Sequence, residues 1–161
     1  MTAPVRNSEP TVIHVALGAR AYDIVIGRGT LASLGARMAA LRPGARAAIV
    51  TDENVARRHL AAARQALAAA GVEAASVTVP AGEGSKSMAT FERVCDELLA
   101  ARIERNDLVI TLGGGVIGDL AGFAASAVRR GLDFIQVPTT LLAQVDSSVG
   151  GKTGINSRYG K

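Results

Sequence analysis

The chain has 161 residues, enough for one domain with a buried core, and its 48% apolar content excludes an intrinsically disordered protein. Its formal net charge is +4, but the basic residues are scattered and no aromatic side chains alternate with them, so we expect no nucleic-acid partner. Cys95 is the one cysteine, no apolar run approaches the roughly 20 residues of a membrane span, and the polar N-terminus carries no export signal; we therefore expect a cytoplasmic protein.

The first half of the chain predicts a β-hairpin followed by alternating helices and strands. Residues 11–17 and 22–26 are rich in β-forming side chains, and a short segment containing Gly18 separates them. Residues 1–10 are expected to form a flexible tail. The next predicted elements are a helix over 31–41, a buried strand over 47–51, a helix over 55–70 ending at Gly71, and a strand over 73–79.

The second half continues the same alternation. Ser85 or Ser87 is expected to cap a helix, whose predicted apolar face consists of Met88, Phe91, Cys95, Leu98 and Leu99. Strands are predicted over 108–112 and 134–137, and helices over 116–128 and 140–146. Strands that alternate with helices imply right-handed crossovers, so we predict an α/β fold with a mostly parallel sheet flanked by helices.

A run of glycines follows the buried strand over 108–112. Gly113, Gly114 and Gly115 leave no Cβ between the backbone amides and a bulky anion, and a helix that begins there would direct its positive end at a phosphate. The order of these glycines with Gly118 does not match the common G-x-G-x-x-G pattern. A pyrophosphate site and a tight turn without a ligand are therefore equal interpretations of the run alone.

Other polar residues fall at the same edge of the predicted sheet. Asp52 and Asn54 follow a strand, where a carboxylate could accept hydrogen bonds from ribose hydroxyls, although a helix N-cap is the favoured interpretation. Glu83 and Lys86 are three residues apart in a glycine-rich loop, a spacing more typical of a solvated charge pair than of a site. Asp119 either occupies the first turn of a helix or contacts a cofactor.

The segment 138–156 is the most specific part of the chain. Hydroxyl groups, one carboxylate and one lysine lie among glycines, without the periodicity that core packing requires. Such a segment is typical of a functional loop. His14 and His59 lack the spacing of metal ligands, and we interpret them as ordinary strand and helix-surface residues.

Three motifs together closely resemble the 3-dehydroquinate synthase family: Gly113-Gly114-Gly115-Val116-Ile117-Gly118-Asp119, then Arg130-Gly131, then the run from Gln136 to Thr153. The similarity is sharp from about Gly82 onward. It implies that residues 11–161 form a Rossmann-like NAD-binding domain, the N-terminal part of a two-domain enzyme. That enzyme converts 3-deoxy-arabino-heptulosonate 7-phosphate, a small phosphorylated sugar acid, to 3-dehydroquinate and phosphate in the shikimate pathway of aromatic amino acid biosynthesis, with transient reduction of NAD.

The resemblance also implies a set of site residues. The implied NAD contacts are Asp52, Asn54, Glu83, Lys86, Gly114, Gly115, Gly118, Asp119, Thr139 and Thr140. The implied catalytic residues, facing the substrate or the nicotinamide, are Arg130, Asp146, Lys152 and Lys161, of which the last three are also implied NAD contacts. A divalent metal, zinc or cobalt, would be held by a second, helical domain that this chain lacks, and the full-length protein would be a homodimer. We therefore expect the isolated chain to be inactive.

Two alternatives stay open at this point. The chain could belong to another sugar-phosphate cyclase, such as 2-deoxy-scyllo-inosose synthase, although Gly150-Gly151-Lys152 favours the dehydroquinate enzyme. It could also be a dinucleotide-binding module without catalysis. The spacer Asn156-Ser157-Arg158-Tyr159-Gly160-Lys161 departs somewhat from the family pattern but keeps the final Gly-Lys.

Overall fold

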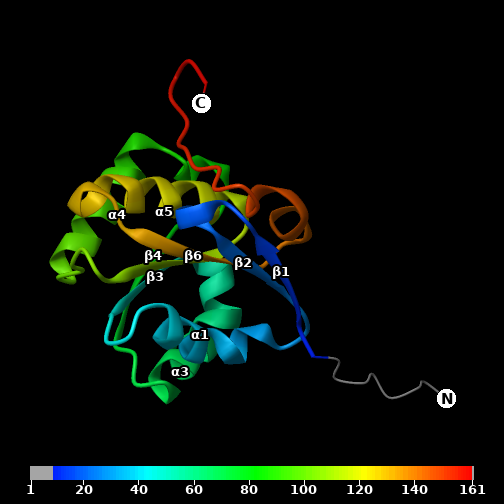
Figure 1. Cartoon of the computed structure of the whole chain (residues 1–161). Coiled ribbons are helices and arrows are strands. Elements are labelled where there is room, and N and C mark those ends of the chain that lie inside the picture. The colour runs from blue at the N-terminus through cyan, green and yellow to red at the C-terminus, as the bar shows by residue number, and fades with distance from the viewer. Residues whose placement is uncertain (1–8, 161) are drawn as a thin grey trace.

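Four parallel strands form the central sheet in the order β4-β3-β5-β6, and β1 and β2 form a separate antiparallel hairpin (Figure 1). The structure, a computed structural model, describes residues 9–160, so Lys161 and most of the expected tail over 1–10 lie outside the described residues. The strands are β1 Thr11–Val15, β2 Tyr22–Ile26, β3 Ala47–Asp52, β4 Ala74–Val79, β5 Leu108–Gly113 and β6 Asp133–Pro138. The helices are α1 Leu34–Leu41, α2 Glu53–Val55, α3 Ala61–Ala69, α4 Met88–Ala100 and α5 Gly115–Ala127.

Helices cover both faces of the sheet, which confirms the predicted fold class. Successive strand residues point to opposite faces, so Val50 and Val109 pack with α4 and α5, whereas Ile49 and Ile110 pack with α1 and α3. Figure 1 shows these helix pairs above and below the sheet. A parallel sheet buried on both faces requires strands that are apolar throughout, which explains the unbroken burial of β5.

The helix ends confirm several predictions made from side-chain chemistry. The Ser87 hydroxyl accepts a hydrogen bond from the Thr90 amide and caps α4, whereas Ser85 donates to the carbonyl of Pro80. Gly71, at φ +72°, ends α3 as predicted, and Val72 donates back to the carbonyl of Leu67. The helix predicted over 55–70 begins earlier, at α2, and passes through a π-helical turn, Ala56–Leu60, before α3.

Two further details differ from the predictions. The first hairpin strand ends at Val15 and not at residue 17, because Val15 pairs with Tyr22 and a 3₁₀ turn over Gly18–Arg20 takes over. The apolar face predicted for α4 is partly wrong, since Met88 is 62% exposed and Leu99 is 41% exposed. Val94 and the predicted Leu98 define the buried face; Leu99 lies about 100° further around the helix, and Met88 belongs to its first turn.

The parallel strands bring the site elements to one side of the molecule. Because all four strands run in the same direction, their C-terminal ends share one edge of the sheet, called the carboxyl edge below. α5 begins at this edge and runs back to the opposite one. The chain after β6 turns at the carboxyl edge into a helix over 141–147, whose last five residues, Ala143–Ser147, are π-helical.

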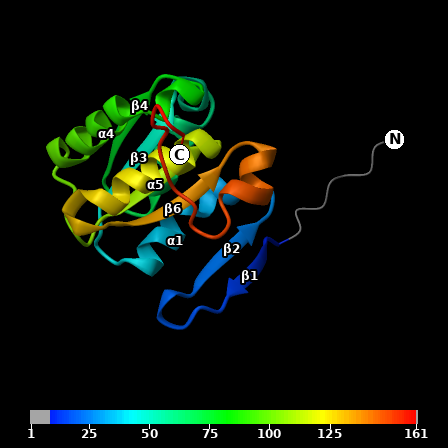
Figure 2. The same ribbon diagram turned by 90° about the horizontal axis from the view of Figure 1, so that it is seen from above.

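The last described segment has little regular structure and lies over α5 (Figure 2). Ile155 packs against the core that α4 and α5 share, and the Gly154 amide donates to the carbonyl of Asp119. Residues 153–156, called the strap below, therefore connect the end of the chain to α5. Among residues 9–160, no helix combines the length and apolar character needed to span a membrane.

Candidate functional site

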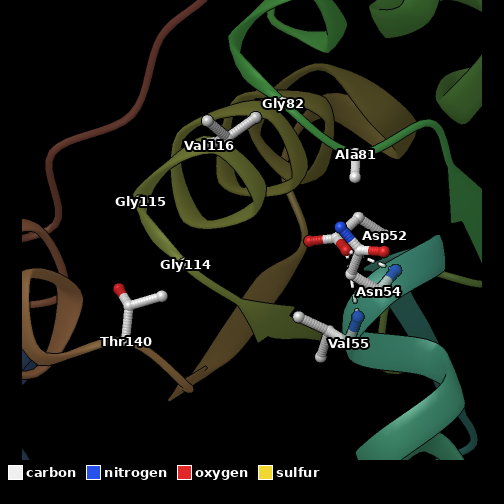
Figure 3. Close-up of a pocket in the computed structure, with 9 residues that line it drawn as sticks. All are labelled: Asp52, Asn54, Val55, Ala81, Gly82, Gly114, Gly115, Val116 and Thr140. Atoms are coloured by element: carbon white, nitrogen blue, oxygen red, sulfur yellow. Dashed lines mark hydrogen bonds between the residues drawn. The ribbon is translucent and has the colours of Figure 1, made fainter.

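A cleft of about 340 Å³ opens at the carboxyl edge, between the ends of β3, β4, β5 and β6 (Figure 3). Its lining consists of Asp52, Asn54, Val55, Ala81, Gly82, Gly114, Gly115, Val116 and Thr140. Five predicted cofactor residues are thus brought together from three loops: Asp52, Asn54, Gly114, Gly115 and Thr140. Figure 3 shows Asn54 and Asp52 on one side of the cleft, Thr140 on the other, and the glycine turn between them.

The glycine turn leaves the N-terminus of α5 accessible. Gly114 is the N-cap residue, and no described side chain caps the helix there. The amides of the first turn have no acceptor within the helix, and the helix dipole adds positive potential, so the turn suits a phosphate group. A Cβ at Gly114 would lie 3.1 Å from the Thr140 methyl group, and one at Gly115 would lie 3.0 Å from the Ser147 hydroxyl. Side chains at these positions would therefore crowd the cradle.

Asp52 has the structural role that the sequence favoured. Its Oδ1 accepts hydrogen bonds from the amides of Asn54, at 2.9 Å, and Val55, at 3.0 Å, and so caps α2. The same carboxylate lines the cleft opposite the glycine turn (Figure 3). A cap and a hydrogen-bond acceptor for ribose hydroxyls are compatible, because a carboxylate can accept about four hydrogen bonds.

Threonine hydroxyls at the carboxyl edge offer polar groups to a ligand. Thr140 Oγ1 accepts from the Ala143 amide and caps the following helix, while the Thr139 amide donates to the carbonyl of Gly113 at 2.9 Å. The hydroxyls of Thr139 and Thr51 are buried and have no hydrogen-bond partner within residues 9–160. Buried polar groups are normally satisfied, so the orphaned hydroxyl of Thr139, whose amide contacts the glycine turn, fits a bound ligand there, whereas Thr51 does not line the cleft.

Lys86 is buried, contrary to the solvated charge pair expected from its spacing to Glu83. Its side chain is 4% exposed, and its Nζ lies 2.7 Å from Asp119 Oδ2 and 3.5 Å from Glu83 Oε1. Asp119 lies on the second turn of α5 and not on the first. The sequence placed both residues in the implied cofactor site but not in contact, because 33 residues separate them.

The substrate-side residues are only partly brought together. Lys152 Nζ lies 2.8 Å from Asp146 Oδ1, and both side chains are more than half exposed. Arg130 follows α5 and precedes β6, so this chain places it at the opposite edge of the sheet, with a left-handed φ of 67°. Lys161 lies outside the described residues.

Two residues near the site were missed by sequence analysis. The Asn156 amide nitrogen Nδ2 donates to Glu83 Oε1 at 2.8 Å, and its backbone N–H donates to the Lys86 carbonyl at 2.7 Å. Thr51, the last fully buried residue of β3, has the orphaned hydroxyl described above. Thr51 could have been found from its position immediately before Asp52. Nothing in the sequence pattern indicates the contact between Glu83 and Asn156.

No group of three or more His, Cys, Asp and Glu residues able to hold a metal ion occurs within the described part of the chain. The residues present therefore do not fit the divalent metal that the family resemblance implies. Cys95 is also a poor candidate for chemistry, because burial, and then the charge of Asp96, raises the pKa of its thiol.

Comparisons with known proteins agree with this geometry. Residues 76–161 match the family described as 3-dehydroquinate synthase N-terminal. The chain is 68% identical to a 3-dehydroquinate synthase of Rhodopseudomonas palustris (strain BisB18) and 66% identical to one of Nitrobacter hamburgensis; each match covers 100% of this chain and 42% of the relative. The chain thus spans about two fifths of the length of these curated relatives.

Solved structures show the same fold. A 2-deoxy-scyllo-inosose synthase in complex with carbaglucose-6-phosphate, NAD⁺ and Co²⁺ superposes with a TM-score of 0.84 at 24% identity, over 94% of this chain and 41% of the other. A 2-epi-5-epi-valiolone synthase from Streptomyces hygroscopicus with bound NAD⁺ and Zn²⁺ gives a TM-score of 0.76 at 34% identity, over 89% of this chain and 39% of the other.

Proposed function

The chain belongs to the 3-dehydroquinate synthase family, and from this premise we propose that it is the NAD-binding domain of an enzyme that forms 3-dehydroquinate. The domain would extend over residues 11–161. The observation that carries the proposal is the cleft at the carboxyl edge, where the uncapped N-terminus of α5 faces the Asp52 carboxylate. An anion cradle opposite a ribose acceptor is the arrangement that a dinucleotide requires.

The residues of the cleft have distinct proposed roles. The amides at Gly114 and Gly115 would bind the pyrophosphate, with Gly118 leaving room on the same helix. Asp52 and Asn54 would bind the adenosine side. The hydroxyls of Thr139 and Thr140, the loop residues Glu83 and Lys86, and Asp119 on α5 complete the proposed NAD contacts.

NAD held by these residues would supply reversible hydride transfer with a substrate alcohol, which accounts for the use of NAD without net oxidation. The side chains of this chain would then bind and orient the phosphorylated sugar acid. Lys152 would offer a point charge to an anionic group of the substrate, and Asp146, 2.8 Å away, would orient that ammonium group. Lys161 is proposed to complete this substrate side, whereas Arg130, at the opposite edge of the sheet, does not reach this cleft within one chain.

The rest of the protein would supply what this chain lacks. The curated relatives are more than twice as long as the chain, and we assign the metal ligands to the part that it does not cover. A homodimeric full-length protein and a cytoplasmic location belong to the same proposal. A chain that binds NAD without metal ligands should not turn over substrate by itself.

A chimera tests this proposal. Residues 1–161 are joined to the remaining part of the Rhodopseudomonas palustris relative, and phosphate release from 3-deoxy-arabino-heptulosonate 7-phosphate is measured with NAD and Zn²⁺. We expect phosphate and 3-dehydroquinate from the chimera and neither from the isolated chain. Turnover by the isolated chain, or a folded chimera that converts glucose 6-phosphate instead, would contradict the proposal.

A further inference from the structure

We propose that Asn156 is a positioning residue that fixes the strap to the loop carrying Glu83 and Lys86, and thereby couples the substrate-side segment to the cofactor site. The expected effect on NAD binding rests on the proposed function. The contacts of Asn156 do not depend on it. Asn156 lies on neither wall of the cleft and would act through the residues that it holds.

The two hydrogen bonds of Asn156 reach both ends of one short loop. Its Nδ2 donates to the Glu83 carboxylate at 2.8 Å, and its backbone N–H donates to the Lys86 carbonyl at 2.7 Å. A neutral amide that donates to a carboxylate forms a charge-assisted hydrogen bond, stronger than one between neutral groups. Asn156 thus fixes the side chain of one loop residue and the backbone of the other.

The loop is in turn bonded to α5. Lys86 Nζ lies 2.7 Å from Asp119 Oδ2, while the strap residue Gly154 donates its amide to the Asp119 carbonyl at 3.2 Å. The strap therefore contacts α5 directly and also through Lys86. The three segments form a closed circuit of contacts between the cofactor loop, α5 and the strap.

Gly122 on α5 allows the strap to approach the helix closely. A Cβ at Gly122 would lie 2.5 Å from the Thr153 methyl group, a distance that real contacts essentially never show. Ile155, between Gly154 and Asn156, packs against the core. The strap is therefore seated by packing as well as by hydrogen bonds, and residue 156 is held at a defined position.

In sequence, the strap begins directly after the substrate-side residue Lys152. Lys152, which pairs with Asp146, immediately precedes Thr153, the first strap residue. A displacement of Asn156 would accordingly move the loop that carries Glu83 and Lys86. It would also make the position of Lys152 less fixed, because the strap that follows Lys152 would no longer be held in place. This is the physical basis of the proposed coupling.

Hydrogen exchange tests the geometry without any ligand. The probes are the amides of Ser85 and Lys86, which donate to the carbonyls of Gly82 and Glu83. In Asn156→Ala we expect these amides to exchange about tenfold faster than in the parent, while the amides of β3 and β5 keep their rates. Asn106→Ala is the matched control, an exposed asparagine in a cleft at the opposite edge. Unchanged exchange at residues 85 and 86 in Asn156→Ala would overturn the proposal.

A substitution cycle tests the coupling to NAD. Asn156→Asp places a second carboxylate against Glu83 and should weaken NAD binding about tenfold, the loss expected for one charge-assisted hydrogen bond. In the background of Glu83→Gln, the same Asn156→Asp change restores an amide–carboxylate pair with the partners exchanged, and NAD binding should improve relative to Glu83→Gln alone. A merely structural role predicts the same loss in both backgrounds, which would overturn the proposal. A parent that binds no NAD would refute the proposed function, and the exchange experiment would still decide the role of Asn156.

Discussion

At the scale of single residues, Asp52 combines a structural and a proposed binding role in one carboxylate. Oδ1 accepts from two amides of the helix that follows β3, and the side chain lines the cleft. The cap needs only an oxygen acceptor, whereas binding to ribose hydroxyls benefits from the negative charge. The two roles can therefore be separated by substitutions that remove the charge or the whole acceptor.

Asp52→Asn is expected to keep the stability of the chain within about 0.5 kcal/mol, because an asparagine oxygen also caps helices well. Asp52→Ala should lower the free energy of unfolding by about 1 kcal/mol, the usual cost of a lost N-cap. Both variants should bind NAD more weakly. Urea unfolding and NAD titration measure the two effects, and an Asp52→Ala variant as stable as the parent would contradict the cap assignment.

At the scale of elements, α5 has two contact surfaces built on glycines. Its N-terminus at Gly114 faces the cleft, and its side at Gly122 receives the strap. A glycine inside a helix normally costs about 1 kcal/mol relative to alanine, so the contact with the strap must offset that cost. The close approach of Thr153 supplies the reason for glycine at this position.

Gly122→Ala should therefore destabilise the chain by about 1–2 kcal/mol despite the better helix propensity of alanine, because overpacking against Thr153 outweighs it. Adding Thr153→Ser removes the nearest methyl group and should recover part of that loss, because the Phe134 ring still lies 3.3 Å from the added Cβ. Gly84→Ala is the control, since a Cβ there meets nothing within 4 Å. Thermal unfolding of the variants decides the matter; a Gly122→Ala variant more stable than the parent would show that the strap does not pack there.

The elements of the fold were predictable from the sequence, whereas several long-range contacts of the site were not. The strands, helices and the glycine turn were predictable because apolar periodicity and glycine chemistry are local signals. The burial of Lys86 was not, since its partner Asp119 is 33 residues away and only the folded sheet brings them together. The bond from Asn156 to Glu83 spans 73 residues and has no local signal at all.

At the scale of the whole molecule, several large apolar side chains stay exposed on the helix after β6. Leu141 is 74% exposed, Leu142 is 69% exposed and Val145 is 68% exposed. Clustered exposed apolar groups favour association in water. Under the proposed function, this surface would be covered by the part of the enzyme that the curated relatives have beyond the matched stretch.

The isolated chain is accordingly expected to self-associate at high concentration. Replacing Leu141 and Leu142 with glutamine should shift it towards the monomer, because the exposed apolar area becomes smaller. Leu41→Gln is the matched control, as Leu41 is 67% exposed at the far end of α1. Sedimentation velocity measures the effect, and equal association of the double variant and the control would contradict this interpretation of the surface.

The central claim, that the carboxyl-edge cleft binds NAD, is tested most directly by calorimetric titration of NAD into the parent and into Gly114→Val. The valine side chain would occupy the cradle at the start of α5, where even a Cβ lies 3.1 Å from the Thr140 methyl group. We predict one NAD per parent chain and binding at least about tenfold weaker in the folded variant. A folded parent that binds no NAD, or a Gly114→Val variant that binds it equally well, would contradict the account.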